Sequence, residues 1–149
     1  MKTFTLSIRK YAILFSILLL TSFAFSQTSY VEVFVNWPAF SSENRVEIYT
    51  PSNTLISTID NGFTGGTNNS FSTTISLGCI PDGNNYYFIM YDTANDGWDG
   101  PDNISIFSGG ATVINQNGDT AINSGAPPVF FNVNGGCSGT CDSTVSSFP

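Results

Sequence analysis

Side chains able to bind a metal ion gather in one short stretch of the sequence, between residues 92 and 103. Four carboxylates and two asparagine amides fall within these twelve residues, and Gly97 and Gly100 permit sharp turns. Hard cations such as Ca²⁺ take six to eight oxygen ligands from groups of this kind. Crowded carboxylates also repel one another unless a cation neutralises them. We therefore predict a Ca²⁺ site whose side-chain ligands are Asp92, Asn95, Asp96, Asp99 and Asp102.

This acidic stretch differs from an EF-hand loop. Asp92, Asp96 and Gly97 match the first, fifth and sixth positions of such a loop. Ala94 lacks the oxygen of the third position, and Asn103 replaces the bidentate Glu of the last. No helical pattern flanks the stretch. A purely structural alternative therefore stands beside the calcium site: the Asp and Asn side chains cap tight turns.

Trp98 lies in the middle of the acidic stretch and allows two interpretations. Its ring could stack on the sugar rings of a polysaccharide or on another surface partner. Alternatively, it folds over the edge of the hydrophobic core, which is the more common place for a tryptophan ring.

The composition excludes most kinds of catalysis. The chain contains no His, and all its Lys residues lie within the first ten positions. Nucleophile systems that depend on His, Schiff-base chemistry and His-ligated metals are therefore excluded from the segment that follows. A pair of carboxylates acting on a glycosidic bond stays chemically possible. The carboxylates crowd into one loop, however, and we expect a noncatalytic protein.

The first 26 residues have the three parts of a secretory signal peptide. Three cations lie within the first ten residues, an apolar run extends from Tyr11 to Leu20, and Ala24 and Ser26 are the small residues before a cleavage site. The apolar run is shorter than the roughly 20 residues needed to cross a membrane comfortably. We predict cleavage before Gln27, a secreted or cell-surface location, and no later membrane span.

Charge is distributed unevenly along the chain. Beyond residue 26 there are eleven acidic residues and a single cation, Arg45, so the mature net charge is −10. Proteins recognise nucleic acid by neutralising its phosphates with Lys and Arg. The mature chain is therefore not expected to bind nucleic acid, whereas its charge suits a cation partner.

Three cysteines agree with export to an oxidising compartment. We expect one disulfide, between Cys79 and Cys137, which would tie the middle of the domain to its end. The pair Cys137–Cys141 is the alternative. Zinc is not expected, because four ligands at a suitable spacing are missing.

Beyond the signal peptide, apolar residues recur with period two rather than with the period of a helix. The segment 86–91 is apolar or aromatic on both faces, which predicts a central strand covered on both sides. Seven or eight short strands with Gly-, Asn- and Asp-rich turns predict an all-β fold, a small antiparallel β-sandwich or jelly roll. The expected strands lie at 31–37, 45–49, 55–59, 71–77, 86–91, 104–106, 113–114 and 129–133.

We therefore expect three parts: a signal peptide at 1–26, a β-sandwich domain at 27–137 and a linker at 138–149. The linker is polar and contains few residues able to pack, so it would lead to a further domain of a longer polypeptide.

The stretch Tyr87–Gly100, preceded by Cys79-Ile-Pro-Asp-Gly, resembles the Gly-Asp-Gly-Trp-Asn-Gly modules of secreted Bacteroidota proteins. The resemblance covers roughly residues 74–137. Asn95 stands where those modules usually have Gly, and Asp99 where they usually have Asn, so Asn95 must tolerate any left-handed backbone there. The resemblance implies a module of a multidomain exported protein, found beside peptidase, adhesion or fibronectin-like domains and a type IX secretion sorting tail.

Together these features predict a noncatalytic, calcium-stabilised module of a secreted or cell-surface protein, with a role in adhesion or in binding polysaccharide or another surface component. The alternative is an accessory or pro-region of an exported hydrolase, a peptidase or glycosidase, whose catalytic domain lies downstream.

Overall fold

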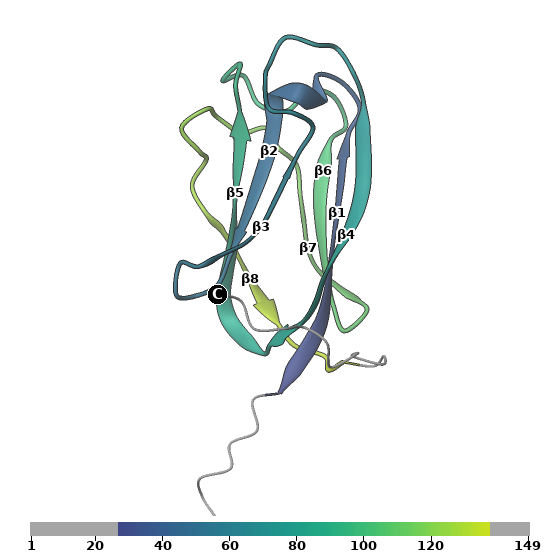
Figure 1. Cartoon of the computed structure of the whole chain (residues 1–149), viewed down its shortest axis with the longest axis vertical. Coiled ribbons are helices and arrows are strands. Elements are labelled where there is room, and N and C mark those ends of the chain that lie inside the picture. Colours follow the sequence, from purple (N-terminus) through teal and green to yellow (C-terminus); the bar gives the residue numbers. More distant parts are fainter. Residues whose placement is uncertain (1–26, 138–149) are drawn as a thin grey trace, which may run out of the picture.

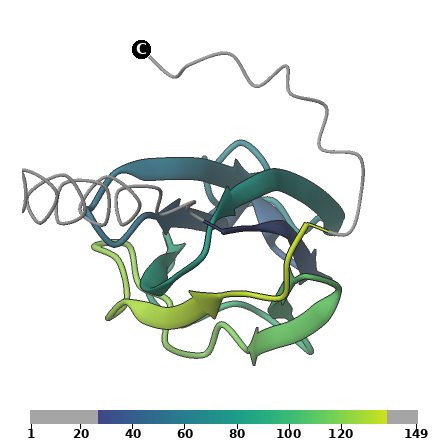
Figure 2. The ribbon, with the colours of Figure 1, turned by 90° about the horizontal axis from the view of Figure 1, so that it is seen from below.

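The structure is a computed structural model that describes residues 27–137. Eight antiparallel strands form two four-stranded sheets that pack face to face (Figures 1 and 2). The predicted all-β sandwich is therefore confirmed. One sheet has the order β4-β1-β6-β7 and the other β3-β2-β5-β8. The elements are β1 (Thr28–Trp37), the 3-10 helix η1 (Ser41–Glu43), β2 (Asn44–Tyr49), β3 (Leu55–Asp60), β4 (Phe71–Pro81), β5 (Gly83–Asp92), β6 (Asn103–Ser108), β7 (Ala111–Gln116) and β8 (Val129–Val133).

The core lies between the sheets and follows from the period-two pattern, because alternate residues of a strand point to the same face. From one sheet, β1 contributes Val31, Val33, Val35 and Trp37, all fully buried. The first sheet also contributes aliphatic side chains from β6, and the other sheet contributes Phe88 and Met90 from β5 and further aliphatic side chains from β2. Each sheet thus places its two central strands over the core.

Strand β5 is central in its sheet, as expected, but it is not covered equally on both faces. Tyr86, Phe88 and Met90 are buried, whereas the alternate residues on the outer face are only half-buried. On the outer face, Tyr87 stacks on Tyr49 of the adjacent strand. Ile89 and Tyr91 lie against Gly125 in the segment before β8. The outer face of β5 is therefore covered only in part, by stacking between neighbouring strands and by one loop segment.

The predicted disulfide forms between Cys79, in β4, and Cys137, which follows β8, with 6.2 Å between their Cα atoms. It lies at the end of the sandwich where β1 begins, because Thr28 Oγ1 donates to Cys137 Sγ at 3.6 Å and Tyr30 pairs with Cys79. Cys141, the predicted signal peptide at 1–26 and the predicted linker at 138–149 lie outside the described residues.

The opposite end of the sandwich carries η1, the start of β2, the end of β5 and the loops that follow β5 and β7 (top of Figure 1). The acidic stretch therefore belongs to one end of the domain, and the disulfide to the other. Within residues 27–137, no helix has the length and apolar character needed to cross a membrane.

Candidate metal site

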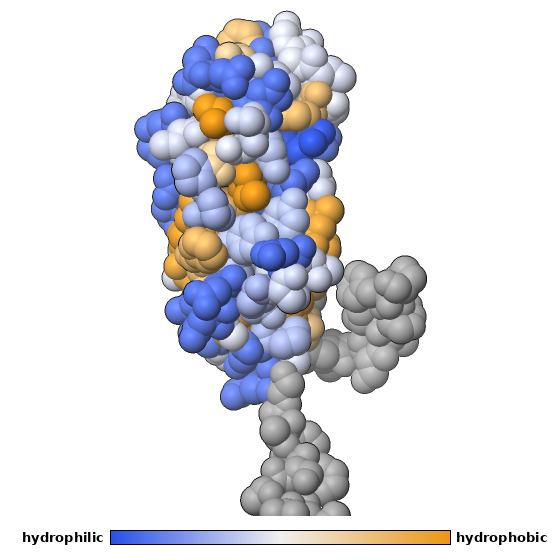
Figure 3. Space-filling view, turned by 90° about the vertical axis from the view of Figure 1, so that its left-hand side faces the viewer, coloured by the Kyte–Doolittle hydropathy of each residue, from blue (hydrophilic) through white to orange (hydrophobic). Residues whose placement is uncertain are grey.

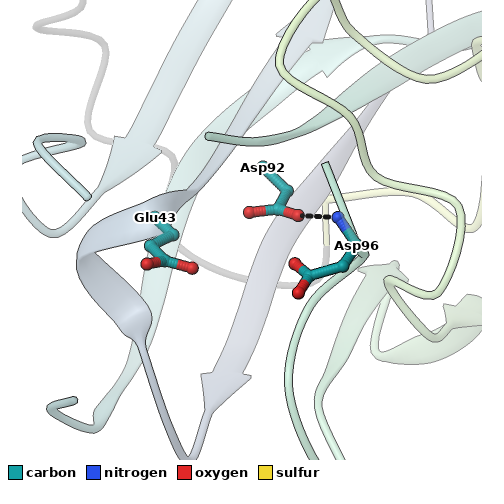
Figure 4. A group of neighbouring side chains, drawn as sticks. All are labelled: Glu43, Asp92 and Asp96. Atoms are coloured by element: carbon teal, nitrogen blue, oxygen red, sulfur yellow. Dashed lines mark hydrogen bonds between the residues drawn. The ribbon is translucent and has the colours of Figure 1, made fainter. Parts of the chain in front are cut away.

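Three carboxylates from two separate segments converge at the upper end of the sandwich. Glu43 comes from η1, Asp92 ends β5, and Asp96 follows in the loop (Figure 4). One carboxylate oxygen from each side chain lies within 4.8 Å of the others. The three side chains differ in exposure: Asp92 is buried, Glu43 is half-buried and Asp96 is exposed. The cluster therefore has an anchored inner ligand and an open outer side.

Asp92 is held by the backbone of its own loop. Its Oδ1 accepts a hydrogen bond from the N–H of Ala94 at 3.0 Å, and its Oδ2 accepts from the N–H groups of Asp96 and Gly97, both at 2.9 Å. Burial raises the pKa of Asp92, an effect that the three backbone hydrogen bonds oppose. These bonds organise a tight turn, as the turn-capping interpretation requires. An ionised carboxylate offers about four lone pairs, so a cation could still bind.

Glu43 joins the cluster because β2 pairs with β5. The strand register places Asn44 opposite Asp92, so the residue before Asn44 reaches the acidic loop. Glu43 Oε1 accepts from the N–H of Gly66 at 2.9 Å, and its backbone oxygen accepts from the N–H of Thr93 at 3.0 Å. Glu43 was not predicted as a ligand. Only the pairing of β2 with β5 would have indicated it.

The other predicted ligands are Asn95, Asp99 and Asp102, and each has its own contacts. Asn95 adopts a left-handed backbone, with φ of 66°, and its side-chain oxygen accepts from the N–H of Asn123 at 2.8 Å. It therefore ties its loop to the segment before β8. Asp99 is half-buried, and burial, followed by the nearby charges of Asp96 and Glu43, raises its pKa.

Asp102 is buried immediately before β6, with 4% of its surface exposed. Burial is the largest of several effects that raise its pKa to about 6, and the charges of Asp119 and Asp99 act in the same direction. Backbone N–H groups of Asp102 and Gly118 oppose this shift, although neither carboxylate oxygen has a partner in hydrogen-bonding geometry. The charge of Asp99 thus acts on Asp102, and Asp99 in turn is affected by the charges of Asp96 and Glu43.

Trp98 packs into the core and does not offer its ring to a ligand. It is 4% exposed, its Nε1 donates to the backbone oxygen of Tyr91 at 2.9 Å, and its ring meets Trp37 edge to face at 5.3 Å. Gly118 lies so close to the ring that even a methyl group there would collide with it. Ligand stacking by Trp98 is thus not supported, and its position matches the core-packing interpretation.

At Gly97, the loop after β5 passes close to the backbone of the loop after β7. This residue has φ of 89°, and a Cβ built there would lie 2.7 Å from the backbone oxygen of Asp119. The N–H of Trp98 donates to the oxygen of Gly118 at 3.1 Å. Glycine, the buried indole and this hydrogen bond together hold the loop after β5 against the loop after β7.

Among residues 27–137, no basic side chain forms an ion pair with Glu43, Asp92 or Asp96. Arg45 is the single Lys or Arg in residues 27–137. Its guanidinium lies over the ring of Phe63, 3.8 Å from the centroid, and within 4.0 Å of carboxylate oxygens of Glu47 and Asp60. Glu43, Asp92 and Asp96 can therefore supply oxygen ligands to a hard cation, and no ion pair within the described residues joins them to a basic side chain.

Comparison with known proteins adds no family to this description. A scan of protein-family models, a search of curated proteins and a search of solved structures each found no match. The interpretation of the site therefore depends on its own geometry.

Proposed function

We propose that the chain is a noncatalytic module of a secreted or cell-surface protein, stabilised by Ca²⁺ bound between Glu43, Asp92 and Asp96. The observation that carries the proposal is the convergence of these three carboxylates, whose oxygens lie within 4.8 Å of one another. Arg45, the single basic residue among those described, pairs instead with Glu47 and Asp60. The Cys79–Cys137 disulfide supports export, because disulfides persist mainly in oxidising compartments.

A cation at this position would join two parts of the fold. Glu43 precedes β2, whereas Asp92 and Asp96 belong to the end of β5 and its loop. Asp92 would be the ligand already in place, because three backbone N–H groups fix its carboxylate. Backbone oxygens and water would complete the six to eight ligands that Ca²⁺ requires. The proposed ligand set thus includes Glu43 and omits Asn95.

The binding partner that we propose is a polysaccharide or a similar neutral surface component. A row of side chains crosses the outer face of the sheet β3-β2-β5-β8: Leu55, Tyr49, Tyr87 and Phe130 are successive cross-strand neighbours. Tyr49 and Tyr87 stack with 5.0 Å between centroids and cover each other, whereas Phe130 is 57% exposed. This face mixes polar and apolar residues (Figure 3), as an amphipathic sugar surface requires.

Calorimetric titration of the full chain with Ca²⁺ tests the metal site. We expect binding in the wild type and its loss in Glu43→Gln, a variant that keeps the acceptor for the N–H of Gly66. Glu32→Gln, on the outer face of the other sheet, should bind as the wild type does. At a free Ca²⁺ concentration of 100 times Kd, one bound ion would raise the free energy of unfolding by about 2.7 kcal/mol. This corresponds to an increase in Tm on the order of 10 °C. Unchanged binding by Glu43→Gln would contradict the proposed ligand set.

Co-sedimentation with insoluble polysaccharides tests the partner. Phe130→Ala should reduce the bound fraction, and Tyr30→Ala, on the outer face of the other sheet, should not. Equal sedimentation of both variants and the wild type would exclude Phe130 from the binding surface.

A further inference from the structure

Three asparagines of the sandwich domain are followed directly by glycine: Asn61, Asn117 and Asn134. In such a pair the backbone nitrogen of the glycine can attack the side-chain carbonyl carbon of the asparagine, because glycine has no side chain to hinder the approach. The attack needs a side-chain amide that can rotate and a backbone N–H that is not engaged elsewhere. The three pairs are alike in sequence but differ in their structural surroundings.

In the pair at Asn61, both reacting groups are engaged. The side-chain nitrogen of Asn61 donates to Ser41 Oγ at 2.8 Å, and the N–H of Gly62 donates to Asp60 Oδ1 at 3.0 Å. Ser41 is fully buried, so the amide of Asn61 is held against a fixed part of η1. This pair is therefore protected by its hydrogen bonds.

The pair at Asn117 is protected by a hydrogen bond and by packing. The side-chain nitrogen of Asn117 donates to Asp119 Oδ2 at 2.6 Å. Gly118 is buried against the ring of Trp98, and its backbone oxygen accepts from the N–H groups of Trp98 and Ala121 at 3.1 and 2.8 Å. The backbone of Gly118 is thus held away from a reaction with the side chain.

The pair at Asn134 has neither kind of protection. Asn134 follows β8, and both it and Gly135 are exposed. Within the part of the chain that the structure describes, neither the side chain of Asn134 nor the N–H of Gly135 has a hydrogen-bond partner. Ser108 holds the backbone of Asn134 instead: its Oγ accepts from the N–H at 2.9 Å and donates to the carbonyl oxygen at 2.6 Å. Both reacting groups of this pair are therefore available.

We propose that Asn134 is a deamidation site. The nitrogen of Gly135 forms a bond to Cγ of Asn134, the bond from Cγ to Nδ2 breaks, and ammonia leaves with the proton of the glycine nitrogen. Water then opens the resulting cyclic imide at either of its two carbonyl carbons and gives aspartate or isoaspartate. The overall exchange of ammonia for water needs no oxidant or reductant, and it does not depend on the metal site or on a polysaccharide.

The modification would alter the end of the sandwich that carries the disulfide. Either product adds a negative charge shortly before Cys137. Isoaspartate also adds a carbon to the backbone at residue 134, so Ser108 could no longer hold the N–H and the carbonyl oxygen as it does now. The same segment passes close to Gly109, where an added Cβ would lie 2.7 Å from the Cα of Gly135. Isoaspartate would therefore loosen the chain between β8 and the disulfide.

Peptide mapping of the full chain, after storage in mildly alkaline buffer, tests the proposal. Chymotrypsin places the three asparagines in different peptides, because Phe63 and Phe131 separate them. In the folded chain, Asn134 should gain the mass of deamidation roughly tenfold faster than Asn61 and Asn117, because those two pairs must open locally before they react. In the chain unfolded in urea, the three pairs should convert at similar rates. Asn134→Ser should remove the mass gain from its peptide.

Three results would overturn the proposal. The first is conversion of Asn61 or Asn117 in the folded chain at least as fast as that of Asn134. The second is a folded chain in which Asn134 stays intact under conditions that convert it in urea. The third is a mass gain that persists in the same peptide of Asn134→Ser, which would assign the reaction to another residue, such as Asn132.

Discussion

Replacing Trp98 with Phe tests whether the indole anchors the acidic loop to the core. The variant keeps an aromatic ring next to Trp37 but loses the hydrogen bond from Nε1 to the oxygen of Tyr91. A typical intramolecular hydrogen bond contributes about 1 kcal/mol. The smaller ring also buries less apolar surface, which costs about 1 kcal/mol more at roughly 25 cal/mol per Å². Trp98→Phe should therefore destabilise the fold by about 2 kcal/mol.

Urea and thermal unfolding measure this effect. A loss of about 2 kcal/mol lowers Tm by roughly 10 °C in a domain of this size, and the urea midpoint should fall without a change in slope. Phe130→Leu is the matched control, because that ring is 57% exposed, and its effect should stay within about 0.5 kcal/mol. If Trp98→Phe melts within about 2 °C of the wild type, the indole is not an anchor and our account of the loop is wrong.

Two further changes probe the ends of the sandwich. The disulfide Cys79–Cys137 spans a sequence separation of 58, so Cys79→Ser should cost oxidised protein about 4 kcal/mol in chain entropy and leave the melt of reduced protein nearly unchanged. Equal melts of the oxidised forms would refute the bridge. Gly97→Ala should destabilise by more than Gly110→Ala, by about 1 kcal/mol or more. Both glycines have positive φ, but only at Gly97 would a Cβ meet backbone, that of Asp119. Equal losses in unfolding free energy would contradict this.

Much of the fold could be predicted because strand periodicity is a local property. Val31, Val33 and Val35 alternate with polar or half-buried residues, and the structure buries all three. Aromatic residues on the outer face of β5 misled the same reasoning, because Tyr87 is covered by stacking on Tyr49 rather than by another layer. The apolar character of a residue does not show whether its side chain is covered by a neighbouring strand of the same sheet or by another layer of the fold.

The candidate site was harder to predict, because its residues come from distant segments. Asp92 could be proposed from its place at the end of an apolar strand. Glu43 could not, since only the register that sets Asn44 opposite Asp92 brings it near. Asn95 could be proposed as a ligand because an amide oxygen can bind a cation. The same oxygen can also accept a hydrogen bond from a backbone N–H group, and here it accepts from that of Asn123. Sequence patterns indicate the donors, whereas the fold decides what each donor contacts.

The position of the disulfide has a mechanical consequence. Thr28 and Cys137 lie at the same end of the sandwich, where the start of β1 pairs with the end of β4. A force applied between these two residues would be transmitted through the disulfide to Cys79 in β4. It would separate β4 from β1 one hydrogen bond at a time. Strands loaded in this way separate at lower force than strands sheared along their length. The acidic loops, at the far end, would be the last part of this path to bear tension.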